Sequence, residues 1–184
     1  MKKHILSVVV MSAFSLAVTS FSASAATSNT ANVTLSGIIS AATCGMEVNG
    51  VSGGTRVDTG MHVVDDFTGN ANTYVGTPVP MTVTVKNCTP AGAATTGSTG
   101  WLYVSGNTAA NGNNNIFVGS NTSTGFMVLD EADSPVANET PVSLNLPEAA
   151  TTASYSFTAA MASTTETPTA GLYTAPIVIA YATE

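Results

Sequence analysis

Basic residues are almost missing from this sequence. Its 184 residues include four Lys and Arg together, against eleven Asp and Glu. Two of the four, Lys2 and Lys3, stand at the start of the chain, which leaves Arg56 and Lys86 for all the rest. Such a chain offers no basic surface to the phosphates of a nucleic acid or to anionic lipid headgroups. We therefore expect neither of them as a partner.

Long helix-forming side chains are also scarce, because charged residues make up only 8% of the sequence. Thr, Ala, Asn, Ser, Gly and Val dominate instead, a composition that favours strands and turns. No stretch of a dozen residues has the apolar stripe of an amphipathic helix. Short strand-like runs recur between turn-rich stretches, at Met61–Phe67, Val79–Cys88, Trp101–Ser105, Asn115–Gly119, Phe126–Asp130, Val142–Leu146, Ala153–Met161 and Leu172–Ala182. This pattern predicts an all-β sandwich of two sheets, since a parallel α/β fold would need crossover helices.

The sequence has only one long apolar run, and that run lies at the start. It covers Ile5–Val18, follows a basic start and precedes the small residues Ala23-Ser24-Ala25, as in a signal peptide. We expect residues 1–25 to be removed and the chain to be exported. No other run approaches the roughly 20 residues of a membrane helix, so we expect no membrane insertion.

Cysteine occurs only twice, as Cys44 and Cys88. Oxidising conditions outside the cytoplasm favour a disulfide between them, and two cysteines leave one pairing. Closing this loop would stabilise the fold by about 4 kcal/mol in the loop-entropy model. The alternative, a reactive or metal-binding pair, lacks a CxxC motif, and His62 is the only histidine after the leader.

Candidate catalytic and metal-binding groups are few. The segment GVSGG (residues 50–54) matches the serine-elbow pattern, with Ser52 as nucleophile and His62 as base, but it lacks the flanking strand and helix. We interpret it as a glycine-rich loop and place His62 on a strand. Two acidic clusters, Asp65-Asp66 and Asp130-Glu131-Asp133, lack the spacing of a calcium loop, and the second is typical of a β-turn. We expect no enzyme activity, no metal and no cofactor.

The segment after the predicted leader has the alternation of an amphipathic β-strand. Val33, Leu35, Gly37 and Ile39 fall on one face, and Asn32, Thr34 and Ser36 on the other. Such a strand needs a partner sheet. The alternation alone leaves open whether that sheet belongs to the same chain or to another molecule.

Four segments in order resemble the subunits of type 1-like fimbriae built by the chaperone–usher pathway: ANVTLSGIISAATC, VPMTVTVKNC, TGFMVLDEADSPV and SYSFTAAMASTTETPTAGLYTAPIVIAY. The resemblance implies an incomplete immunoglobulin-like β-sandwich, the pilin fold, which lacks its last strand and leaves an apolar groove open. It implies that a periplasmic chaperone first fills the groove. At the outer-membrane usher, the N-terminal extension of another subunit then replaces it, by donor-strand exchange.

Carried onto this sequence, the resemblance implies a donor-strand extension over residues 26–40 and a pilin domain over residues 41–184. The donor side chains would be Val33, Leu35 and Ile39, with Gly37 where the groove wall leaves no room for a side chain. The acceptor groove would be walled by the C-terminal strand, through Ile177, Ile179 and Tyr181. Pro176 indicates an edge strand in which pairing begins after the proline.

The function so implied is that of a structural subunit of a bacterial surface fimbria, contributing to cell adhesion. Its partners would be other copies of itself or related pilins, the chaperone and the usher. It would travel through the periplasm to the cell surface. The alternative is an adhesive minor subunit that binds a host glycan or protein through the loops Thr89–Gly100 and Gly106–Asn115, near the aromatic residues Trp101 and Tyr103.

Overall fold

Eight β-strands and one short 3-10 helix form the described part of the chain, in a computed structural model. The structure describes residues 43–89, 100–110, 113–120, 123–146 and 151–183. The chain divides into two units, Met1–Leu35 and Ser36–Glu184, and all described residues belong to the second. The elements are β1 (Thr43–Val48), β2 (Val51–Ser52), η1 (Val64–Phe67), β3 (Thr73–Thr89), β4 (Gly100–Gly106), β5 (Thr124–Leu129), β6 (Pro141–Ser143), β7 (Thr152–Ser163) and β8 (Ile177–Thr183). None of the described helices is long and apolar enough to cross a membrane.

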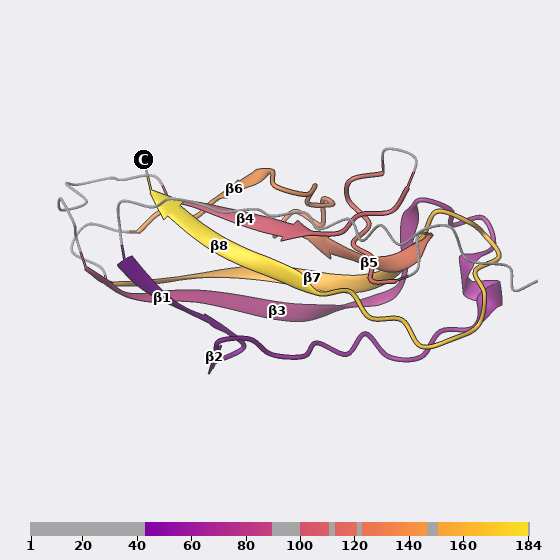
Figure 1. The fold of residues 1–184 in the computed structure, drawn as a ribbon, viewed down its shortest axis with the longest axis horizontal. Coiled ribbons are helices and arrows are strands. Elements are labelled where there is room, and N and C mark those ends of the chain that lie inside the picture. Colours follow the sequence, from indigo (N-terminus) through magenta and orange to yellow (C-terminus); the bar gives the residue numbers. More distant parts are fainter. Residues whose placement is uncertain (1–42, 90–99, 111–112, 121–122, 147–150, 184) are drawn as a thin grey trace, which may run out of the picture. The chain divides into compact units, whose positions relative to one another are not determined.

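The strands form two antiparallel sheets (Figure 1). The first sheet has the order β2-β1-β3-β7-β5, and the second has the order β6-β4-β8. The long strands β3 and β7 form the middle of the first sheet and pair from Thr73↔Ser163 to Lys86↔Thr152, with a register shift between Val75 and Val79. The predicted all-β architecture of two sheets is confirmed.

The core lies between the two sheets and follows from the period-2 alternation of the strands. On β3, the side chains of Met81, Val83 and Val85 are buried, while the residues between them are half-exposed. They belong to one cluster of buried residues from both sheets, which also includes Leu102, Val104, Phe117, Val128, Val136, Leu144, Leu146, Phe157 and Tyr181. The strand predicted over Val79–Cys88 is therefore the C-terminal part of the longer strand β3.

The predicted disulfide is present. Cys44 on β1 is bonded to Cys88 on β3, and 44 positions separate the two residues in sequence. The β1–β3 pairing shifts register between Thr43 and Gly45, beside the bond. The disulfide thus joins the first described strand to the strand that pairs with it.

Some strand predictions were wrong, either in the boundaries of the strand or because the residues form another kind of structure. Residues 61–67 are not a strand: irregular chain carrying His62 leads into the 3-10 helix η1, which begins where the Asp66 carboxylate accepts a hydrogen bond from the Val63 N–H at 3.0 Å. Residues 115–119 form only isolated bridges, through Phe117. The C-terminal strand begins at Ile177 and not at Leu172, so pairing does begin directly after Pro176.

The predicted signal peptide (1–25) and donor strand (26–40), with Val33, Leu35, Gly37 and Ile39, lie outside the described residues.

Candidate functional site

One edge of β8 lacks a partner strand among the described residues. On its other edge, β8 pairs with β4 from Gly106↔Ile177 to Gly100↔Thr183. Ile177 and Ile179 are half-buried on one face, whereas Val178 on the opposite face is 66% exposed. An unpaired strand edge presents a row of backbone N–H and C=O groups and is a template for the addition of another strand.

A groove of about 960 Å³ runs beside this edge. Ile177 and Ile179 of β8 line it from the three-stranded sheet, and Met46 and Val48 of β1 line it from the five-stranded sheet. Apolar side chains behind these walls complete the lining, from β3, β5 and β7: Met81, Phe126, Ala159 and Met161. The groove therefore lies where the two sheets are not closed by a shared strand, and its walls are mainly apolar.

A segment without regular structure also borders the groove. Residues 53–62 connect β2 to the loop before η1 and all contribute to the groove lining. None of them makes a backbone–backbone hydrogen bond to another described residue, although the Gly60 N–H donates to the Asp58 carboxylate at 2.9 Å. This segment is therefore not paired with any of the described strands.

Tyr181 is placed differently from the other two predicted acceptor residues. Its side chain is 7% exposed in the core cluster and is not part of the groove lining. It packs on Gly100, where an added Cβ would stand 2.2 Å from the Tyr181 hydroxyl oxygen. That hydroxyl is buried with no hydrogen-bond partner among the described residues, and burial raises the pKa of Tyr181.

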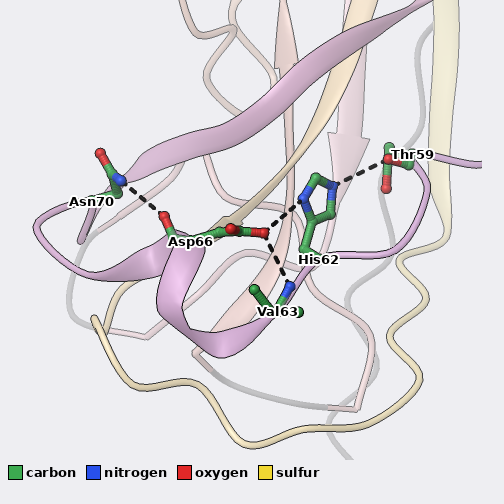
Figure 2. Close-up of polar contacts among 5 residues, drawn as sticks. All are labelled: Thr59, His62, Val63, Asp66 and Asn70. Carbon is green, nitrogen blue, oxygen red and sulfur yellow. Dashed lines mark hydrogen bonds and ion pairs between the residues drawn. The ribbon is translucent and has the colours of Figure 1, made fainter.

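The proposed serine–histidine pair is not assembled. The Ser52 hydroxyl donates to the Glu47 carboxylate at 2.9 Å. As Figure 2 shows, the two ring nitrogens of His62 face other groups: Nδ1 lies 3.7 Å from the Asp66 carboxylate, and Nε2 lies 3.2 Å from the Thr59 carbonyl oxygen. His62 thus holds its own loop and does not contact Ser52.

The acidic clusters serve as local backbone caps. The Asp130 carboxylate accepts hydrogen bonds from the N–H groups of Ala132 and Ser134 at 2.8 and 2.9 Å, in the β-turn predicted after β5. Asp66 does the same for Val63 at the start of η1. Within the described ranges, no three His, Cys, Asp or Glu side chains gather as metal ligands.

The aromatic residues proposed for an adhesive surface are both half-buried on β4. Trp101 pairs with Ser143 and Ala182, and Tyr103 pairs with Pro141 and Ala180, so both sit in the middle strand of the smaller sheet. The Trp101 indole N–H is buried. Of the neighbouring loop Thr89–Gly100, residues 90–99 lie outside the described part.

Sequence reasoning missed the β1 wall of the groove. Cys44, Met46 and Val48 do alternate with polar or small residues, which is a strand signal. The signal is short and runs into the turn at Asn49-Gly50, where both residues have positive φ. Met46 and Val48 line the same groove as β8 because one sheet packs on the other. The local sequence pattern holds no information about that packing.

Comparison with known proteins identifies the family. The model of the Fimbrial protein family matches residues 33–181, so the chain belongs to this family. Among solved structures, the chain is similar to the P pilus rod subunit PapA, with 15% identity, 77% of this chain and 99% of that chain covered, and a TM-score of 0.59. It is also similar to a subunit in the structure of a chaperone–usher pilus, with 14% identity, coverage of 84% and 96%, and a TM-score of 0.57. No curated protein matches.

Membership of this family makes the chain a fimbrial pilus subunit and not an enzyme. Its all-β sandwich is the fold of pilus subunits, as the two solved structures show. As a pilus subunit, it polymerises with other pilins and forms part of a surface fimbrium.

Proposed function

We propose that the subunit polymerises head to tail by donor-strand exchange, with residues 26–40 of one copy filling the groove of another. The observation that carries this proposal is the edge of β8, which has no partner strand among the described residues and lies beside an apolar groove. Strand addition to such an edge gains affinity from backbone hydrogen bonds and specificity from alternate side chains, and pilin donor-strand complementation is a recognised example.

The dimensions of donor and acceptor agree. β8 has seven residues, and the predicted donor from Val33 to Ile39 also has seven, so each spans about 23 Å when extended. The donor side chains Val33, Leu35 and Ile39 are apolar, as are the groove walls at Met46, Ile177 and Ile179. Burying three such side chains contributes roughly 5 to 9 kcal/mol before backbone pairing and entropy are counted.

The groove also supports a role for helper proteins before assembly. An apolar groove beside an unpaired edge invites non-specific association while the subunit is alone. We propose that a periplasmic chaperone occupies the groove first and that an outer-membrane usher exchanges the chaperone for the donor of another copy. The route then runs through the periplasm to the cell surface. Because the contact is heterologous and does not close, a filament results.

Assembled surface material tests the proposal on an unboiled denaturing gel. Wild-type chains should give a ladder of multimers. Deletion of residues 26–39, or Leu35→Asp on the apolar donor face, should abolish the ladder, because a carboxylate cannot be buried unpaired in the groove. Ser36→Asp, on the opposite face, is the matched control and should keep it. A ladder assembled from the deletion variant alone would refute the proposal.

A further inference from the structure

The chain between donor and folded body is short. Ile39, the last predicted donor residue, and Thr43, the first residue of β1, are four positions apart. Four residues of fully extended chain reach about 14 Å at most. In the fibre proposed above, on which this inference rests, the body of the donating copy must therefore lie against one end of the occupied groove.

One end of the groove carries exposed apolar side chains. Met61 and Leu172 both line the groove, and at 93% and 86% exposed they are the most exposed large apolar residues in the described part. Val63, two positions after Met61, is 60% exposed. Leu172 stands five positions before β8 begins and Met61 three positions before η1, and Figure 1 shows both segments at the end where β8 begins. We call Met61, Val63 and Leu172 the apolar collar.

The loop that presents two of these residues is fixed by polar contacts (Figure 2). Between Met61 and Val63, His62 lies with Nδ1 3.7 Å from the Asp66 carboxylate and Nε2 3.2 Å from the Thr59 carbonyl oxygen. The same carboxylate accepts the Val63 N–H, and the Asn70 side-chain amide donates to the Asp66 carbonyl oxygen at 2.9 Å. Polar contacts thus hold the loop that exposes Met61 and Val63.

The back of the loop is also closely packed. An added Cβ on Gly76 of β3 would lie 2.3 Å from Cε1 of His62, so the ring rests directly on the glycine backbone. The His62 side chain is 11% exposed, in contrast to its neighbours on both sides. Surfaces held in their bound shape lose less entropy on association, which favours an interface role for this loop.

We propose that the apolar collar contacts the folded body of the donating copy, near the start of its β1. Each joint of the fibre then consists of a strand in the groove and a contact between bodies. This contact requires the donor strand to run antiparallel to β8, so that Ile39, at the C-terminal end of the donor, lies beside the first residues of β8. At the other end of β8, Gly100 and Tyr181 are buried and Ala182 is half-buried, so the described residues there offer no comparable apolar surface.

The test uses fibres of the full chain with the double substitution Met61→Ser and Leu172→Ser. We expect the ladder of multimers to form on an unboiled gel, but the multimers to dissociate roughly tenfold faster at a fixed elevated temperature, because two apolar side chains lose their buried contact. Val51→Ser is the matched control, since Val51 is also an exposed apolar residue (46%) at the groove but lies on β2. Dissociation at the wild-type rate would overturn the inference.

A second measurement keeps the inference testable if the double variant fails to assemble. In fibres whose chains are otherwise wild type, a photo-crosslinking amino acid at position 61 should form adducts with residues 40–50 of another copy. Adducts confined to the same copy, or to a different part of the neighbour, would overturn the collar. Donor-strand exchange itself is tested separately: it would be contradicted if the Leu35→Asp variant still gave the ladder of multimers.

Discussion

Met46 of β1 and Ile179 of β8 line the same groove, although they belong to different sheets. In the described part of the chain, no strand pairs with both sheets along this side, where the short strand β2 ends the first sheet and β8 ends the second. This relationship links the fold to the proposed assembly, because a single added strand would cover the side chains of both residues and pair with β8.

Shortening the groove wall should weaken donor binding without unfolding the subunit. Ile179→Ala removes half-buried apolar surface from the wall, and we expect the multimers to dissociate about tenfold faster on heating. The control is Val142→Ala, because Val142 is a half-buried apolar residue on β6 of the same sheet and does not line the groove. Equal dissociation rates for the two variants would contradict the assignment of this face of β8 to the groove.

Gly76→Ala should be more destabilising than an ordinary glycine substitution. Gly76 has φ +77°, which costs a side-chain-bearing residue about 1–2 kcal/mol, and its new Cβ would also displace His62. Gly69→Ala is the control, since Gly69 has φ +74° but no atom within 4 Å of the added Cβ. Chemical denaturation should show a larger loss for Gly76→Ala, and His62→Ala in the same chain should remove the difference. A difference that persists would mean that His62 is not its source.

Removal of the disulfide should lower the free energy of unfolding by about 4 kcal/mol, the loop-entropy value for a bond that spans 44 positions. The variant carries Cys44→Ala and Cys88→Ala, and denaturant titration measures the loss. Wild-type protein under reducing conditions should lose a similar amount. If neither form is destabilised, the bond does not constrain the unfolded chain as the loop-entropy model requires.

Tyr181→Phe should stabilise the fold slightly, because the buried hydroxyl has no partner among the described residues. Burial raises the pKa of Tyr181 above its ordinary value of 10.0. Because the folded state disfavours the phenolate, this group leaves the free energy of unfolding unchanged below pH 10 and lowers it as the pH rises through the folded-state pKa. Thermal unfolding at a series of alkaline pH values should show a smaller loss for the variant than for wild type. An unchanged alkaline profile would mean that another group controls it.

Much of the fold could be predicted from the sequence where one face of a strand is buried. The alternation of Met81, Val83 and Val85 predicted the C-terminal part of β3, because burial of one face of a strand imposes a period of two on its side chains. The same reasoning failed at residues 61–67, where the apolar pattern of a strand is overridden by the Asp66 carboxylate at the Val63 N–H and by the packing of His62 on Gly76. Such contacts join residues that no local pattern connects.

The candidate site was predictable in part for a similar reason. Ile177 and Ile179 follow from strand alternation after Pro176, and both line the groove. Tyr181 shares their alternation but lies beyond the groove, packed on Gly100 in the core. Met46, the opposite wall, required the arrangement of the two sheets. The donor residues remain a prediction, since residues 1–42 lie outside the described part.

The most direct measurement moves the donor onto its own acceptor. A chain that lacks residues 26–39 and carries a copy of residues 27–40 after Glu184, through a short flexible linker, should fold back along β8 as a hairpin. The account predicts a monomer that forms no ladder and melts well above the same chain with Leu35→Asp in the grafted copy. A grafted chain that melts at the temperature of this control, or that still forms multimers, would contradict the claim that the groove accepts this strand.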